Sequence, residues 1–302
     1  MLGLPGGNGQ YGTGMIKERA RCLYRKIAGA LKGTGIGRFH ALRKLDAFLV
    51  SRLSQHQIVI HGHQMILDDA DSLRLSVNHE FEPCETRLFD EQLQEGDVVL
   101  DVGANIGYYT LLAARKVGAK GRVYAFEPDP TNFSLLRRNV ELNGYSNVTL
   151  VNQAVGETSG YLKLYLSDVN AGDHRTYESA GNRRAITIPC TSIDDYFKGQ
   201  ERKLDFIKMD IQGFECRALR GMRDTLESCG DLKLTAEFWP YGLVRAGDSP
   251  RELIRLLELN RFKLYDIDER TGSVGPVDVA KLLASYDHNT ENFTNLFCVR
   301  RA

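Results

Sequence analysis

Short apolar runs and amphipathic stretches alternate along residues 96–302. Unbroken apolar runs are typical of strands covered on both faces, and apolar positions three and four residues apart are typical of helices. The pattern predicts core strands at 98–100, 122–126, 147–151, 204–209, 232–238, 262–267 and 295–300. It predicts helices at 86–94, 108–117, 130–142, 191–197, 213–219 and 249–259. Strands that alternate with helices in this way predict a doubly wound, Rossmann-like α/β fold over 96–302.

The residues before this domain follow a different pattern. Residues 1–14 hold six glycines and little to bury, which predicts a disordered leader. Apolar stripes at helical spacing, with Arg and Lys between them, predict a basic amphipathic helical extension over 15–56. Such helices can lie on an anionic membrane, or they can pack on the main domain with a solvated basic face, which we favour.

A lead-in segment over 57–95 is expected to hold a small hairpin and the helix at 86–94. Residues alternate in polarity on both sides of Gly62, which predicts the hairpin turn there. His61 and His63 flank this glycine. An H-x-H pair can bind a metal ion, but no third ligand lies nearby, so the turn interpretation is favoured.

The strand at 98–100 leads through a glycine turn into the helix at 108–117. Gly103 lets a ligand approach bare backbone, and Gly107 lets the start of the helix pack close to the strand. Free N–H groups at the helix start face a negative group. This layout is typical of a nucleotide site. The turn lacks the middle glycine of the G-x-G-x-x-G dinucleotide fingerprint, and the chain holds no G-x-x-x-x-G-K-[ST] P-loop.

Glu127 ends the next predicted strand. A carboxylate at this place can accept hydrogen bonds from both hydroxyls of a ribose. NAD sites use the same arrangement, so the glycine turn and Glu127 alone leave three classes open. They are an S-adenosylmethionine-dependent enzyme, a nicotinamide-dependent oxidoreductase and a non-catalytic nucleotide-binding module.

The net charge of the chain is zero, but charge is distributed unevenly. Residues 1–60 carry ten Lys and Arg against two Asp and Glu, hence +8, and the remainder carries 29 against 37, hence −8. The main domain is therefore expected to bind no nucleic acid by charge alone. Six scattered cysteines without a C-x-x-C motif predict reduced thiols in a cytoplasmic protein. The basic N-terminal helices add the inner face of a membrane as an alternative location. No apolar run approaches the length of a membrane span.

Four motifs follow the predicted strands in order. They are Asp101-Val-Gly-Ala-Asn-Ile-Gly107-Tyr-Tyr-Thr110, Phe126-Glu127-Pro128, Asn139-x-x-x-Asn143-Gly144 and Lys208-Met-Asp210-Ile-Gln-Gly213-Phe-Glu215. As an ordered set they resemble the FkbM-type methyltransferases, over about 81–300. The chain departs from this family at Gln212, where glutamate is common. The resemblance implies a class I sheet whose last strand is antiparallel, S-adenosylmethionine as the cofactor, and methyl transfer to a hydroxyl, often on a sugar, glycolipid or secondary metabolite.

The resemblance also implies a cofactor-binding role for particular residues. Asp101 and Gly103 would hold the methionine part of the cofactor, and Glu127 would bind its ribose diol. The turn beneath the cofactor would be shaped by Ala104, Asn105 and Gly107. The adenine would be bordered by Gln153 and Ala154.

Methyl transfer from a sulfonium needs an aligned acceptor and a group that removes its proton. Ligands of open α/β sheets lie beyond the carboxyl ends of the strands, where we expect Asp210 and Glu237. We predict His174 as the base, because imidazole titrates near neutral pH, with Asp210 and Glu237 orienting the acceptor hydroxyl. His288 and a carboxylate of raised pKa are alternatives. Asp210 and Glu237 could bind a divalent ion, but nothing supplies a third ligand, so no metal is predicted.

The acceptor pocket is expected between two further features. Alternating runs at 161–166 and 185–189 bracket a polar loop over 167–184, and Trp239-Pro240-Tyr241 follows the strand at 232–238. An aromatic wall suits a sugar ring and an apolar chain equally well. The expected partner is a small-molecule, glycan-linked or lipid-linked hydroxyl.

Overall fold

The computed structural model describes residues 20, 22–24, 55–167, 171–178, 183–200 and 203–301. Its central sheet has eight strands: β3 (Val98–Val102), β4 (Arg122–Phe126), β5 (Val148–Val151), β9 (Phe206–Met209), β10 (Leu232–Phe238), β11 (Lys263–Asp268), β12 (Ser273–Pro276) and β13 (Thr294–Arg300). They are ordered β12-β11-β13-β10-β9-β3-β4-β5. β13 runs antiparallel to both of its neighbours, whereas β3, β4, β5, β9 and β10 pair in parallel. The predicted α/β fold and its antiparallel last strand are therefore confirmed.

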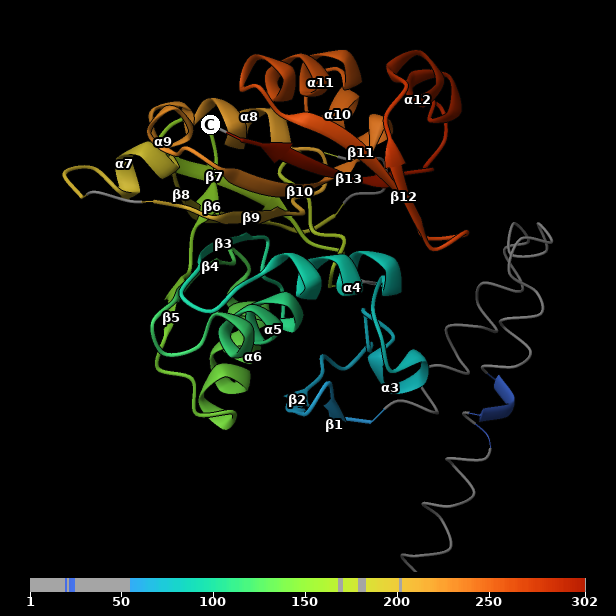
Figure 1. Cartoon of the computed structure of the whole chain (residues 1–302). Coiled ribbons are helices and arrows are strands. Elements are labelled where there is room, and N and C mark those ends of the chain that lie inside the picture. The colour runs from blue at the N-terminus through green and yellow to red at the C-terminus, as the bar shows by residue number, and fades with distance from the viewer. Residues whose placement is uncertain are drawn as a thin grey trace, which may run out of the picture.

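Helices cover both faces of this sheet (Figure 1). One face carries α4 (Pro83–Gln92), α5 (Tyr108–Val117) and α6 (Pro130–Leu142), and the other carries α7 (Ile193–Tyr196), α8 (Glu215–Arg220), α9 (Arg223–Ser228) and α11 (Pro250–Leu259). Alternate strand residues point to opposite faces, so Val99 packs into the first of these cores and Leu100 into the second. Both side chains are fully buried. The apolar run in β3 reflects this two-sided burial.

The helix predicted over 86–94 is displaced toward its N-terminus. α4 begins at Pro83, and its N-cap residue Glu82 makes no side-chain cap. The carboxylate of Glu269 accepts the backbone N–H groups of Cys84 and Glu85 instead, at 3.1 and 2.8 Å. This cap comes from far along the chain, so local sequence could not place the start of the helix.

The predicted hairpin is present as β1 (Gln57–Ile60) and β2 (His63–Ile66), with the turn at His61 and Gly62. Each of the two histidine rings contacts the hydroxyl of a different tyrosine. His61 Nε2 lies 3.1 Å from the hydroxyl of Tyr108, and His63 Nε2 lies 2.7 Å from that of Tyr145. The turn interpretation of this H-x-H pair is consistent with these contacts.

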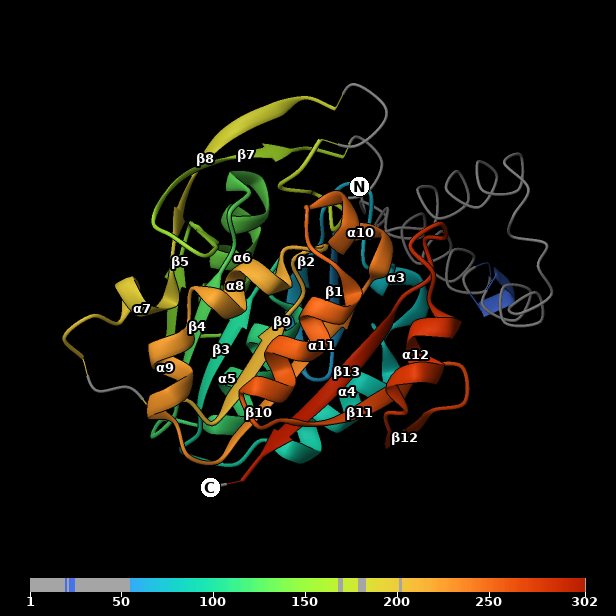
Figure 2. The ribbon, with the colours of Figure 1, turned by 90° about the horizontal axis from the view of Figure 1, so that it is seen from above.

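Several short elements were absent from the sequence prediction. They are β6 (Ala154–Val155), α3 (Leu75–Asn78), α9, α10 (Pro240–Arg245), β12 and α12 (Val279–Ser285). β6 pairs with β8 (Ala185–Thr191), and β8 pairs with β7 (Gly160–Tyr165), in a separate three-stranded sheet beside β5 (Figure 2). β7 and β8 are the two alternating runs that bracket the predicted polar loop.

The predicted leader over 1–14 and most of the extension over 15–56 lie outside the described residues. In the part of the chain that the structure describes, no helix has both the length and the apolar character that a membrane crossing requires.

Candidate active site

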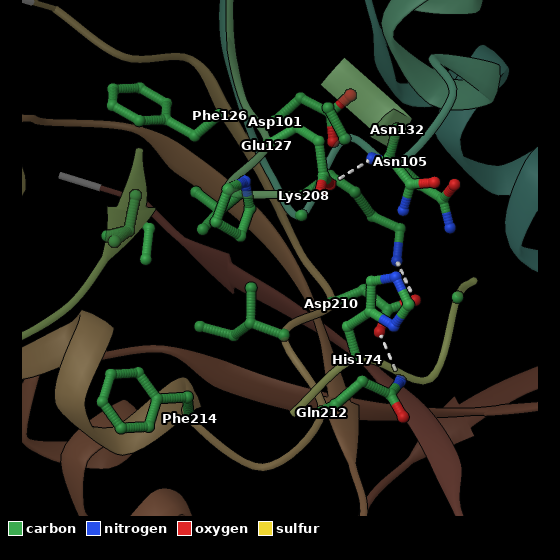
Figure 3. Close-up of a pocket in the computed structure, with 18 of the residues that line it drawn as sticks. Asp101, Asn105, Phe126, Glu127, Asn132, His174, Lys208, Asp210, Gln212 and Phe214 are labelled. Carbon is green, nitrogen blue, oxygen red and sulfur yellow. Dashed lines mark hydrogen bonds and ion pairs between the residues drawn. The ribbon is translucent and has the colours of Figure 1, made fainter. Parts of the chain in front are cut away.

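A pocket opens at the carboxyl ends of β3, β4 and β9 (Figure 3). Its volume, including the open mouth, is about 900 Å³. Nine of the predicted site residues line it: Asp101, Gly103, Ala104, Asn105, Glu127, Gln153, Ala154, His174 and Asp210. Gly107 and Glu237 lie behind the lining. The topology thus brings residues from three of the four sequence motifs, together with Gln153, Ala154 and His174, to one cavity, as the carboxyl-end rule predicts.

The glycine turn packs tightly against the end of β9. Gly103 has a φ of +88°, and a Cβ there would collide with the backbone carbonyl of Asp210. Gly107 has a φ of +98°, and a Cβ there would lie 2.8 Å from the side chain of Leu136 in α6. Gly103 thus admits the end of the neighbouring strand and also lines the pocket, whereas Gly107 admits helix α6 rather than the preceding strand, which corrects the reason expected for Gly107. The consequence is that the turn and Asp210 are in direct contact.

The carboxylate of Glu127 accepts hydrogen bonds from two backbone N–H groups. One carboxylate oxygen accepts the N–H of Asn105 and the other accepts the N–H of Asp129, both at 2.8 Å. Its side chain is only 5% exposed, and burial raises the pKa of Glu127 to about 8 against the opposing effect of these hydrogen bonds. Each oxygen keeps lone pairs that can accept a further hydrogen bond from a ligand in the pocket.

Two more residues that line the pocket, Asn105 and Asp101, have side-chain oxygens that can accept further hydrogen bonds. Asn105 has a φ of +51°, and its Oδ1 is buried with no hydrogen-bond partner among the described residues. Asp101 accepts a hydrogen bond of 2.5 Å from the Thr110 hydroxyl, and burial raises the pKa of Asp101 to about 6. Buried polar atoms are normally paired, so the unpaired amide oxygen indicates a ligand that would donate to it.

Asp210 follows β9 and is held by a chain of polar contacts. Gln212 donates from Nε2 to Asp210 Oδ1 at 3.0 Å and to the two oxygens of Glu237 at 3.2 and 3.3 Å. Glu237 is 5% exposed, and burial together with the Asp210 charge raises its pKa well above the usual value. Glu237 therefore reaches Asp210 through Gln212 and does not itself face the cavity. The amide at the position where the family often has glutamate makes this bridge.

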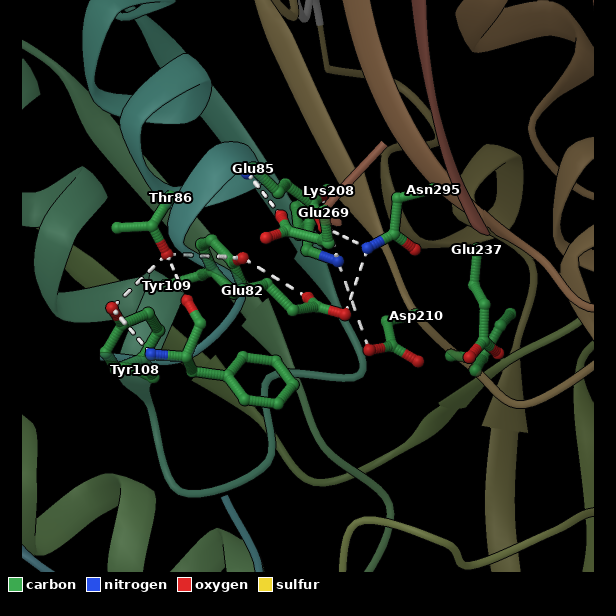
Figure 4. A network of polar contacts seen from close by, with 12 residues as sticks. Glu82, Glu85, Thr86, Tyr108, Tyr109, Lys208, Asp210, Glu237, Glu269 and Asn295 are labelled. Carbon is green, nitrogen blue, oxygen red and sulfur yellow. Dashed lines mark hydrogen bonds and ion pairs between the residues drawn. The ribbon is translucent and has the colours of Figure 1, made fainter. Parts of the chain in front are cut away.

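A buried network beside Asp210 was not predicted from the sequence (Figure 4). Lys208 Nζ lies 3.3 Å from Glu85 Oε1 and 4.0 Å from Asp210 Oδ2, and it lines the pocket. Asn295 donates from Nδ2 to Glu82 Oε1 at 3.0 Å and to Glu85 Oε2 at 2.5 Å. The sequence did contain one signal, because Lys208 interrupts the otherwise apolar strand Phe206–Met209.

The charge of Lys208 is set by its neighbours. Burial by itself lowers the pKa of Lys208, but the carboxylates of Glu85, Asp210 and Glu82 outweigh burial and raise it. Lys208 therefore stays protonated at neutral pH and cannot act as a base. Its ammonium group lies between the side chains of Asp210 and Glu85. Burial, and then the Glu85 charge, raises the pKa of Glu82.

His174 does line the pocket, but its ring is engaged. Its Nδ1 accepts the backbone N–H of Ser167 at 3.0 Å, which places the ring proton on Nε2, 3.9 Å from Asp129 Oδ2. Burial lowers the pKa of His174. A general base needs a free lone pair that faces the acceptor, and this geometry does not supply one. The alternative, His288, is 56% exposed and lies 3.1 Å from Asp287 on the surface.

The aromatic corner expected to shape the acceptor pocket is covered by the polar loop. The guanidinium of Arg175 lies 4.8 Å from the ring centre of Trp239 and 5.9 Å from that of Tyr241. Asp173 binds the same guanidinium at 2.6 Å. The loop also closes over the adjoining side of the pocket, where Asn132 donates to the carbonyl of Ala171 at 3.0 Å. The corner is therefore filled by a side chain of this protein in the described state.

The sheet order, the glycine turn after β3 and the carboxylate after β4 define the class I methyltransferases, whose cofactor is S-adenosylmethionine. The pocket fits this cofactor: it offers a buried carboxylate with free lone pairs at Glu127 and an unpaired amide oxygen at Asn105. When bound, the cofactor supplies a methyl group already activated on a sulfonium.

The chain belongs to the FkbM methyltransferase family. The model of the "Methyltransferase FkbM domain" matches residues 101–264, more than half of the chain. The matched stretch holds the glycine turn, Glu127, the polar loop and Asp210. The resemblance drawn from the four sequence motifs is thus confirmed.

Curated relatives are similar to this chain over part of its length. The hexuronic acid methyltransferase AglP of Haloferax volcanii is 28% identical over 172 residues, covering 57% of this chain and 65% of that protein. Methyltransferase 1 of Beauveria bassiana is 27% identical over 147 residues, covering 42% of this chain and 58% of that protein. The chain thus spans less than two thirds of the length of either relative. A SAM-dependent O-methyltransferase from Thermotoga maritima has a TM-score of 0.41 at 14% identity, covering 82% of this chain and 77% of that one, which is too distant to add to the argument.

Proposed function

We propose that this protein transfers a methyl group from S-adenosylmethionine to a hydroxyl of a sugar, glycolipid or secondary metabolite. The observation that carries the proposal is the direct packing of the glycine turn against Asp210. The contact is made by the backbone carbonyl of Asp210, and the side chain of Asp210 lines the same pocket as the turn. An acceptor hydroxyl bound beside Asp210 would therefore face the methyl donor, and alignment is most of what this reaction requires.

The cofactor roles follow the contacts of the pocket. Glu127 would accept hydrogen bonds from the ribose diol while its two backbone donors hold it in place. Asp101 and the turn at Gly103 would bind the methionine part, with Asn105 Oδ1 accepting a donor of the ligand. Gln153 and Ala154 line the side that would border the adenine.

We assign proton removal to Asp210 in place of His174. Asp210 lines the pocket with a side chain that is 28% exposed, whereas His174 uses its Nδ1 lone pair on Ser167. Lys208 and Gln212 fix the Asp210 carboxylate from two sides, so it is positioned without being neutralised by a close partner. The cofactor would supply the methyl group to the acceptor oxygen, and Asp210 would accept the proton that this hydroxyl loses. His174 and Glu237 are then positioning residues, for the polar loop and for Gln212.

The choice of a sugar hydroxyl is supported by the name of the Haloferax relative, a hexuronic acid methyltransferase, at 28% identity. A nicotinamide-dependent oxidoreductase is the weaker alternative. The turn lacks the middle glycine that lets a pyrophosphate approach, and the family match is to methyltransferases. A non-catalytic module would bind the cofactor without forming product, which the following experiment detects.

The test uses S-adenosylmethionine labelled in its methyl group, the full-length protein and an extract of the source organism, with mass spectrometry of labelled products. A labelled O-methyl product is expected. Asp210→Asn should then lower kcat by about 10²–10⁴-fold, the usual contribution of a positioned base, with cofactor affinity within about twofold. His174→Gln serves as the comparison. If Asp210→Asn keeps wild-type turnover and His174→Gln loses it, the base is His174 and our assignment is wrong.

A further inference from the structure

A second and larger cavity opens beside the cofactor pocket. It lies between the segment that precedes α4, the end of β11 and the segment that leads into β13, and its volume including the open side is about 2320 Å³. Leu73 and Phe81 line both cavities. Phe81 packs edge-on against Tyr108 and Tyr109, with ring centres 6.1 and 6.4 Å apart, at the start of the helix that follows the glycine turn. The two cavities therefore meet at Phe81.

The buried network connects this second cavity to Asp210. Glu82 and Asn295 are part of its wall, and the same two side chains are hydrogen-bonded to each other at 3.0 Å (Figure 4). Asn295 on β13 is the strand-pairing partner of Glu237 on the neighbouring strand β10, and β9 lies on the other side of β10. Neighbouring strands are about 4.8 Å apart, so Asn295 lies about 10 Å across the sheet from the strand that carries Asp210. Phe81 lines both cavities, so a ligand in the second cavity that extends past Phe81 enters the pocket that Asp210 lines.

The wall of the second cavity holds more acidic than basic side chains. Five acidic side chains line it: Glu80, Glu82, Asp268, Glu269 and Glu291. Burial raises the pKa of Glu82, so the negative charge of the wall rests on the other four. The cationic side chains of the wall are Arg74 and Arg270, and Arg270 is paired with Asp268 at 3.2 Å. Amides at Asn78, Asn292 and Asn295 add hydrogen-bonding groups, and the ring of Phe293 is 50% exposed. Many oxygen acceptors beside an exposed aromatic face suit a ligand that carries many hydroxyl or ammonium donors over an apolar ring face.

We propose that this second cavity, which we call the acceptor groove, binds the methyl acceptor, and that the acceptor is a neutral or amino-bearing sugar unit rather than an anionic one. The inference rests on the proposed function and specifies its substrate. A hexuronic acid, the substrate class in the name of the Haloferax relative, would bring its carboxylate against the acidic wall. Like charges placed together across a binding site oppose binding and select against the wrong partner. The aromatic corner at Trp239 offers no comparable opening, because Arg175 covers it.

The experiment first determines the charge of the acceptor. Products labelled from the source extract are hydrolysed to their monomer units, and the labelled unit is identified by mass spectrometry. Methyl glycosides of glucose, glucosamine and glucuronic acid are then compared as acceptors for the full-length protein. The neutral or amino glycoside should be methylated with a kcat/KM about tenfold or more above that of the glucuronide.

Groove variants then test the location. Phe293→Ala and Glu291→Lys change exposed side chains of the groove, so both proteins should fold. Each should raise the acceptor KM by about tenfold while the cofactor Kd stays within about twofold, and Glu291→Lys should raise the relative rate with the glucuronide. The matched controls are Tyr161→Ala, an aromatic residue 79% exposed on β7, and Glu258→Lys on α11, neither of which lines the groove. They should leave the acceptor KM unchanged.

The outcomes separate the two proposals. An anionic labelled monomer, or a wild-type preference for the glucuronide, overturns the charge selectivity. Groove variants that behave like Tyr161→Ala and Glu258→Lys overturn the location. If the protein binds S-adenosylmethionine yet labels nothing in the extract or the glycoside panel, the proposed methyl transfer itself fails, and the acceptor groove fails with it.

Discussion

Glu127 offers the most direct test of the cofactor site, because the structure shows what each of its oxygens does. Replacement by Gln keeps the size of the side chain and removes the charge. In the wild-type protein, the backbone N–H groups of Asn105 and Asp129 each donate to one oxygen of Glu127 at 2.8 Å. In the variant, an NH₂ group replaces one of these oxygens, so one of the two N–H groups faces a donor and loses its acceptor. The variant also loses one acceptor for the ribose diol. Hydrogen bonds to a charged group contribute about 1.5–3 kcal/mol, so the Kd for S-adenosylmethionine should rise by roughly 10–150-fold.

The affinity for S-adenosylmethionine should also depend on pH in a definite direction. Burial raises the pKa of Glu127 to about 8, so the carboxyl of the free protein is mostly protonated at pH 7. A ribose diol that donates two hydrogen bonds favours the ionised form, and binding below pH 8 should therefore release a proton. The affinity of the wild-type protein should increase by up to about tenfold per pH unit from pH 6 and level off above pH 8. In Glu127→Gln this dependence should disappear.

Isothermal titration calorimetry measures both effects. Proton release appears as a binding enthalpy that varies with the ionisation enthalpy of the buffer at pH 7, and thermal unfolding of Glu127→Gln confirms that the variant is folded. An affinity that stays flat between pH 6 and 9 in the wild-type protein, or an unchanged Kd in the folded variant, would refute the assignment of Glu127 to the ribose.

Two further predictions concern the glycine turn and the N-terminal extension. Gly103→Ala combines a φ of +88° with a collision against the Asp210 carbonyl, so chemical denaturation should show a loss of at least about 1–3 kcal/mol, together with weaker cofactor binding. The control Gly144→Ala has a φ of +68° with open space around its Cβ, and it should lose less stability and keep cofactor affinity. Deletion of residues 1–55 should leave cofactor affinity unchanged. If the +8 segment contacts membranes, the full chain should sediment with anionic vesicles at low salt and the deletion should not; a full chain that ignores the vesicles would refute membrane contact.

The sequence by itself determined the order of strands and helices and the place of the cofactor turn. Strand β3 is covered on both faces and begins with an unbroken apolar run, and the boundaries predicted for β4, β10, α5 and α6 match the structure. These features depend on neighbours in the chain, so periodicity and turn residues are enough to find them. Parallel strands then place Asp101, Glu127 and Asp210 at one edge of the sheet.

Tertiary structure alone decided how these residues are used. Asn295 and Glu85 are 210 positions apart in the chain, and Glu269 caps a helix that begins at Pro83. No local pattern marks such contacts, because they depend on the register of β13 and on the packing of α4 across the sheet. The same holds for His174: its residue type suggests a base, and only the fold places the N–H of Ser167 on the lone pair of its Nδ1. Side-chain chemistry can be listed from a sequence, but the partners that set protonation and orientation come from segments that only the folded chain brings together.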